Sequence, residues 1–202
     1  TQSKSSAASD VYKRQHLALA LTLVITVSGL TQTLLAPSQS AEAPRWWTLL
    51  GSLSVIAVSA QCLLGARMAT SWASQRCLEA GESCQWIHWH RAAATPAALS
   101  VLLFVLIALV SGSWGRSQWP LLLVAILLVA TQIGLGVTTL RLGLSQPVVT
   151  VAHQLVACLL VAVLAALTCR RQPVPPDPLP VVLDSSSPVS YTHLTLPTTS
   201  TV

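Results

Sequence analysis

Charged side chains are what this sequence has least of. Only 8% of its 202 residues are Asp, Glu, Lys or Arg, although soluble domains carry about 25%. Because so few charged side chains cannot cover a water-exposed surface, the composition excludes a soluble globular domain. Phe and Met occur once each, whereas Trp occurs seven times and 52% of the residues are hydrophobic. The composition indicates an integral membrane protein.

The sequence also lacks the local motifs of common soluble enzymes. It contains no Gly-x-Gly-x-x-Gly or Walker loop, no zinc-type cysteine pairs and no Gly-x-Ser-x-Gly elbow. The net charge of +5 does not indicate nucleic-acid binding, because the arginines are scattered singly between apolar runs. We therefore expect no nucleic-acid partner.

The two ends of the chain resemble foreign sequence. Residues 10–15 resemble the translation of a transposase mosaic end used in sequencing libraries, and residues 189–194 resemble the translation of its reverse complement. We interpret 1–15 and 189–202 as translated sequencing adapters and exclude both from fold reasoning. The remaining part starts at His16 and contains no lysine.

Five apolar runs are long enough to cross a membrane, which takes about 20 residues. They are predicted at 17–36, 47–70, 91–110, 118–140 and 148–169. Short connections between them, such as 111–117, force neighbouring helices to run antiparallel. The predicted fold is an all-α integral membrane helical bundle with about five transmembrane helices. We expect one separate helix at 16–36, a four-helix domain at 37–171 and a disordered tail at 172–188.

Histidines gather at the starts of the first, third and fifth predicted spans. They are His16, His88, His90 and His153. Because alternate helices of an antiparallel bundle start on the same side, all of them are expected in one leaflet. Ionisable side chains inside a membrane are costly, so we treat them as functional candidates.

The cysteines suggest which side of the membrane this is, because the arginine count on the two sides is equal. Cys77 and Cys84 share the 71–89 loop, so a disulfide can close there, although a redox relay or free thiols are alternatives. Disulfides persist on the oxidising side of a membrane. We therefore predict this loop on the outer face of a bacterial plasma membrane.

The remaining small and aromatic residues of the spans are expected to have structural roles. Cys62, Cys158 and Cys169 are interpreted as small packing residues. The glycines at 51, 65, 134 and 136 are typical of close helix packing. Trp46 and Trp47 are expected at the membrane interface.

His90 and His153 are candidate ligands of a heme iron. Heme accepts imidazole from opposite sides, and two helices of an antiparallel bundle are able to supply it at matched depth. The alternative is that each histidine caps a helix or forms interfacial hydrogen bonds. We prefer His90 to His88, because the two point to different helix faces and the helix is properly formed at His90. Arg91 and Arg141 are candidates for pairing with heme propionates, or else for contacts with lipid headgroups.

The order of these features resembles the heme A synthase family of cytochrome oxidase assembly. It comprises a loop with a cysteine pair, His90-Arg91 entering a span, and a span ending in the run 132–138. Pro147 then precedes His153-Gln154 by six residues. The resemblance covers 16–171. Family members contain two similar four-helix halves, with a histidine near the start of the second and fourth helix of each.

The resemblance implies that this chain carries the second half of such a protein. His90 and His153 then match the ligands of the heme b cofactor, and His16 matches a substrate-heme ligand of the first half. Ile87 stands where the first, catalytic half has a Glu. The family oxidises a methyl group of heme O to the formyl group of heme A, using electrons from a donor that the sequence does not identify. Because the catalytic half is missing, we expect this chain alone to be inactive.

Two other functions fit parts of the pattern. A bis-His membrane electron-transfer cytochrome would bind heme without turning over heme O. A transporter fragment would bind no heme and would carry polar residues at mid-span, where this sequence has few. Beyond heme O, the expected partners are membrane lipid, the electron donor and a second copy of the chain in a homo-oligomer.

Overall fold

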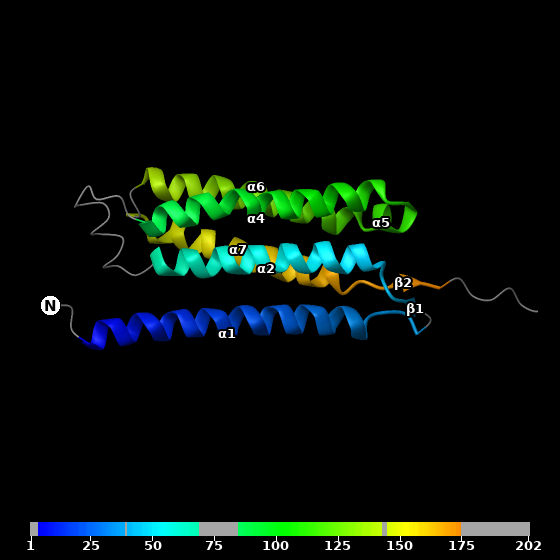
Figure 1. Cartoon of the computed structure of the whole chain (residues 1–202), viewed down its shortest axis with the longest axis horizontal. Helices are drawn as coiled ribbons and strands as arrows, with labels where there is room; N and C mark the ends of the chain where they lie inside the picture. The colour runs from blue at the N-terminus through cyan, green and yellow to red at the C-terminus, as the bar shows by residue number, and fades with distance from the viewer. Residues whose placement is uncertain (1–3, 39, 69–84, 143–144, 175–202) are drawn as a thin grey trace, which may run out of the picture.

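The computed structural model describes residues 4–38, 40–68, 85–142 and 145–174, and these form a bundle of long helices (Figure 1). The elements in chain order are α1 Lys4–Leu34, β1 Ser40–Ala41, α2 Arg45–Met68, α4 Gln85–Val110, α5 Ser113–Ser117, α6 Trp119–Arg141, α7 Pro147–Thr168 and β2 Gln172–Pro173. Five of the helices are long and apolar enough to cross a membrane. The predicted all-α membrane bundle is confirmed.

The helix bounds differ from the predicted spans mainly at the start of two helices. The helix α4 begins at Gln85, six residues before the predicted span, so His88 and His90 both lie within it. The helix α1 begins at Lys4, well inside the segment that was excluded as foreign sequence. In addition, the connection predicted at 111–117 contains the short helix α5. Apolar length therefore located the helices, whereas their polar first turns extend past the apolar runs.

The tail predicted to be disordered from residue 172 begins instead as a short strand. Ser40 lies opposite Pro173 and Ala41 opposite Gln172 in an antiparallel pair. The reason is local: the chain leaving α7 passes the α1–α2 connection at the same end of the bundle (Figure 1). Extended backbones at that distance satisfy each other's amide and carbonyl groups.

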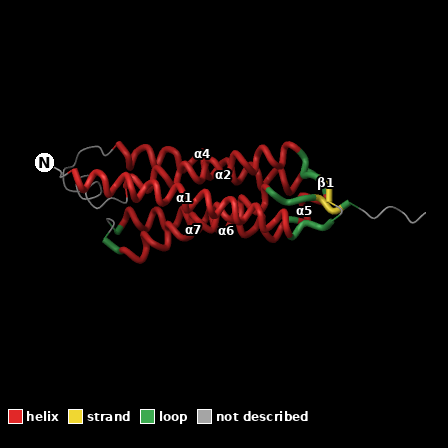
Figure 2. The backbone as a smooth tube through the Cα atoms, turned by 90° about the horizontal axis from the view of Figure 1, so that it is seen from below, coloured by secondary structure: helices red, strands yellow, loops and turns green. Residues whose placement is uncertain are grey.

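The helices pack as two hairpins with α1 along the outside. In the first hairpin α2 packs on α4, in the second α6 packs on α7, and α2 and α7 join the hairpins. The helix α1 contacts α7 and α2 (Figure 2). Leu21 of α1 is buried, but Leu19, Leu23 and Val27 are exposed. An exposed apolar helix face is expected where the surroundings are lipid rather than water.

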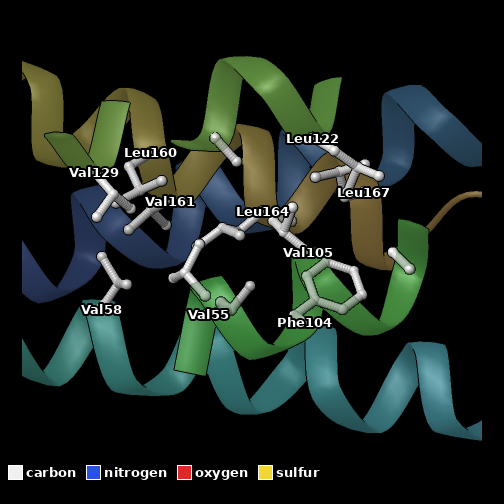
Figure 3. Close-up of a cluster of buried hydrophobic side chains, with 14 of the residues drawn as sticks. Val55, Val58, Phe104, Val105, Leu122, Val129, Leu160, Val161, Leu164 and Leu167 are labelled. Atoms are coloured by element: carbon white, nitrogen blue, oxygen red, sulfur yellow. The ribbon is translucent and has the colours of Figure 1, made fainter. Parts of the chain in front are cut away.

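The core lies where the two hairpins meet, and Figure 3 shows its middle layer. Its largest fully buried aliphatic side chains come from α4, α6 and α7, with valines of α2 beside them. These buried residues include Val55, Val58, Phe104, Val105, Leu122, Val129, Leu160, Val161, Leu164 and Leu167. Gly51 lets α2 approach α7 closely, because a Cβ there would lie 2.5 Å from Thr168 Oγ1.

Trp47 fixes one end of the bundle. The sequence suggested an interfacial side chain, but the indole is fully buried. Its Nε1 donates to the Leu167 carbonyl at 2.7 Å, and its ring lies 4.9 Å from Phe104 and 4.6 Å from Trp114. An indole that satisfies its N–H internally has no need of the membrane interface. The opposite end of the bundle lacks such an anchor among the residues described, and a cavity lies there.

Candidate functional site

A cavity of about 890 Å³ lies among α2, α4, α6 and α7, with Lys13 and Leu17 of α1 on its wall, toward the end where α4 and α7 begin. Its volume falls within the range of small-molecule and cofactor sites, about 300–1,000 Å³. The wall is mostly apolar, with Ala94, Ala97 and Ala98 of α4 leaving room in the interior. The polar side chains on the wall include Gln61, His90, Arg91, Gln132, Arg141, His153 and Gln154. The cavity therefore brings the two predicted iron ligands, His90 and His153, onto one surface.

His90 is held from α2 by an amide and a glycine. Gln61 Nε2 lies 3.1 Å from Nδ1 and 3.5 Å from Nε2 of the ring, and it donates to the His90 backbone carbonyl at 2.7 Å. One turn further along α2, a Cβ on Gly65 would lie 3.0 Å from Cε1 of His90. The imidazole thus occupies space that any side chain at position 65 would fill.

His153 is held from α6 in the same way. Gln132 Nε2 lies 3.3 Å from the ring Nε2, and a Cβ on Gly136 would lie 3.2 Å from Cε1. The other ring nitrogen, Nδ1, is buried without a hydrogen-bond partner, as are the side-chain oxygens of Gln61 and Gln132. A buried polar atom without a partner costs about 1–3 kcal/mol. These three atoms are therefore behind the wall surface, where only a turn of their side chains would bring them to a ligand in the cavity.

The two hairpins supply the cavity with matching side chains. The pattern Val-x-x-Gln-x-x-x-Gly starts at Val58 in α2 and at Val129 in α6, and the pattern His-x-x-x-Ala starts at His90 in α4 and at His153 in α7. Every named position of both patterns lines the cavity. The wall is therefore built from two equivalent sets of residues, one from each hairpin.

Some of the other predicted site residues line this cavity and some do not. Arg91 and Arg141 are exposed side chains on the rim of the cavity. His88 is exposed and is not among the lining residues, whereas His90 is. His16 is also exposed and is not itself a lining residue, although Lys13 and Leu17 on either side of it line the cavity; its Nδ1 donates to the Tyr12 carbonyl at 3.1 Å.

The cysteines fall into three locations. Cys62 and Cys158, interpreted from the sequence as packing residues, line the cavity as free thiols. Cys169 packs at the far end of the bundle against Gly29 of α1, where a Cβ would lie 3.0 Å from Sγ. Cys77 and Cys84, the predicted disulfide pair, lie outside the described residues.

Sequence reasoning missed the glutamines and misjudged two of the glycines. Gly65 and Gly136 were interpreted as general packing positions, yet each faces a histidine ring. The signal that could have identified them is the repeated Gln-x-x-x-Gly spacing, followed in each hairpin by His-x-x-x-Ala. One Gln-x-x-x-Gly is unremarkable in an apolar helix; its recurrence on the helix before each histidine is informative.

No family model, curated protein or solved structure matches this chain. Among the described residues, no cluster of three or more His, Cys, Asp or Glu side chains is placed to hold a metal ion by itself. The function is therefore argued from the chemistry of the cavity wall.

The close approach of Gly136 to His153 gives a prediction with a matched control two residues away. In Gly136→Ala the new methyl group lies against Cε1, so the ring must move and the ¹⁵N signals of the His153 imidazole must shift. Gly134→Ala makes the same chemical change where no atom lies within 4 Å. NMR spectra of ¹⁵N-histidine-labelled protein in detergent test this. Equal responses of His153 to both substitutions would show that Gly136 does not seat the ring.

Proposed function

We propose that this chain is a heme A synthase-type membrane protein whose cavity holds a heme b between His90 and His153. The observation that carries the proposal is the matched pair of imidazoles, each seated against a glycine and held by a glutamine, on one cavity wall. A heme requires only two protein ligands, because the macrocycle itself supplies the equatorial ones.

The residues present fit this group in three respects. The apolar wall suits the flat face of a porphyrin, and the cavity volume of about 890 Å³ suits a cofactor. The His153 Nδ1 has no hydrogen-bond partner in the described residues, so binding of a metal by that nitrogen, after the buried ring turns toward the cavity, would break no hydrogen bond. Arg91 and Arg141 stand at the exposed rim, where guanidinium groups are able to pair with propionates while these remain near water.

The proposed role of the site follows from the residues that would hold the heme and from the apolar wall around it. When bound, the heme supplies one-electron transfer. His90 and His153 would both hold the iron, so the bound group would serve electron transfer rather than substrate binding. The apolar wall keeps water away from the ring plane. The cavity is therefore proposed as an electron relay, and oxidation of the methyl group of heme O takes place at a different site.

We propose His16 as a residue of that second site, as the family resemblance implies. His16 is exposed on α1 and is not itself a lining residue of the cavity, although Lys13 and Leu17 beside it are; its side chain is therefore available to a second heme next to the first one. The electron donor is proposed to be a membrane component that reaches the cavity at its rim.

A second candidate function is a bis-His electron-transfer cytochrome without catalysis. The observation that favours it is that two histidines, His90 and His153, line the same cavity, so both would hold the iron. Turnover separates the two functions.

Heme binding is tested by the absorption spectrum of the reduced, detergent-purified protein. Low-spin, six-coordinate bands are expected. His90→Ala and His153→Ala should each abolish them, because each removes one axial ligand. His88→Ala is the matched control, since His88 is exposed and off the cavity wall, and it should retain the spectrum. Protein that remains colourless after reconstitution with heme would refute the proposed function.

Heme O turnover is tested by expressing the chain in a host that makes heme O but lacks its own synthase. Heme extracted from those membranes is then analysed for heme A. We expect none from this chain alone, because Ile87 stands where the resemblance expects the catalytic Glu. Heme A in the extract would contradict that expectation and would place catalysis within these residues.

For the membrane orientation, we propose a bacterial plasma membrane with the α2–α4 connection on the outer face and a Cys77–Cys84 disulfide within it. A membrane-impermeant maleimide should label intact cells only after reduction. Replacing Cys62, Cys158 and Cys169 by Ala confines the signal to the loop. Labelling without reductant would argue against the disulfide, and labelling only of inverted vesicles would argue against the orientation.

A further inference from the structure

We propose that Gln61 and Gln132 are equivalent positioning residues, each orienting the imidazole on the partner helix of its own hairpin, and that Gln132 in addition tunes the iron bound by His153. The inference rests on the heme site proposed above. It assigns a function to two half-buried glutamine side chains on the cavity wall.

The shared ring contact is the first argument. Both glutamines place Nε2 beside a ring nitrogen, at 3.1 Å for His90 and 3.3 Å for His153. Gln61 also donates to the His90 carbonyl, so it ties α2 to α4. For Gln132 the structure gives only the contact with the ring. The contact common to both glutamines is therefore the one with the imidazole, and tying helices together does not explain the pair.

Their equivalent placement is the second argument. Each glutamine precedes the glycine that seats the same histidine ring by four residues, and this holds in both hairpins. An amide buried in an apolar helix carries a desolvation cost unless its groups are paired. Each hairpin has a glutamine at the equivalent position, in contact with its own histidine ring, despite the desolvation cost. We infer that the two glutamines share the role of orienting these rings.

The two amides differ in their freedom to turn. Gln61 is fixed by its bond to the His90 carbonyl, so its nitrogen side must face the ring. Gln132 has no such anchor, and its Oε1 is buried without a partner. Rotation of the Gln132 side-chain amide by half a turn about its Cγ–Cδ bond would place Oε1 against Nε2 of the His153 ring. The oxygen would then accept a hydrogen bond from the ring N–H. The lone pair is then on Nδ1, the nitrogen that is free of protein partners.

This arrangement is the one that tunes a metal-bound histidine. An acceptor on the second ring nitrogen fixes the tautomer and raises the basicity of the ligand. A stronger acceptor stabilises ferric iron, and the loss of the acceptor favours ferrous iron. A residue that merely fills space in the wall would have no such effect on the iron.

The test measures the ferric-to-ferrous ratio of the whole purified chain at a fixed solution potential, with three variants. Gln132→Glu supplies a charged acceptor and should raise the ratio about tenfold, because partners of metal-bound histidines change metal affinity by at least that factor and the added charge favours the ferric state. Gln132→Leu removes the acceptor and should lower the ratio by a similar factor. Gln118→Leu is the control, because Gln118 lies at the other end of α6 and bonds Ser117.

Opposite shifts for Glu and Leu support the inference, whereas shifts in one direction, or none, overturn it and leave the proposed heme site standing. If Gln132→Leu does not fold, Gln132→Asn replaces it. That variant keeps an amide but is one methylene too short to reach the ring, so it should shift the ratio in the same direction as Leu.

A heme-free measurement keeps the inference separate from the proposed function. If the wild-type chain takes up no heme, the heme proposal fails, and the positioning role is tested by ¹⁵N-histidine NMR of the apo-protein. Gln132→Leu should then shift the His153 ring signals and leave those of His90, and Gln61→Leu should do the reverse. Unchanged ring signals in both variants would overturn the inference.

Discussion

The contact of a glutamine amide with a histidine ring, made once in each hairpin, is the interaction on which the site depends. In lipid a polar side chain finds no water and must find a protein partner. Gln61 with His90, and Gln132 with His153, meet that constraint across the two helices of each hairpin. The glycines beside the rings leave the necessary space. The glycine–ring packing and the glutamine–ring contact thus favour the same alignment of the two helices in each hairpin.

That alignment explains why the cavity lies toward one end of the bundle. At the other end Trp47 fills the space between α2, α7 and the start of α5 with a single large ring. Toward the cavity end, the positions that face inward are alanine and glycine, such as Ala94 and Gly65. A bundle that is tightly packed at one end and open at the other is able to admit a flat ligand without unfolding its core.

The sequence was sufficient for the fold and for part of the site. Apolar length located the spans, because crossing a membrane sets a minimum that the residues themselves satisfy. His90 and His153 were singled out because such side chains are rare in spans, and both line the cavity. The contacts of Gln61 and Gln132, and of Gly65 and Gly136, with the histidine rings were not predicted. The sequence of an apolar helix does not show which neighbouring helix a glutamine faces. The start of α4 at Gln85 was also missed, because its first turn is polar and helix formation there does not depend on hydropathy.

The equivalence of the two hairpins holds deep in the cavity and ends at its rim. Val58 matches Val129 inside, but at the rim the residue after His90 is Arg91, whereas the residue after His153 is Gln154. An interior made of two similar halves would distinguish the two faces of a flat guest only through the positions where the halves differ. Inside the cavity these include Gln61, which is anchored to the His90 carbonyl, and Gln132, which is not. Together with the unequal charges at the rim, these few unmatched side chains would decide which way round such a guest sits.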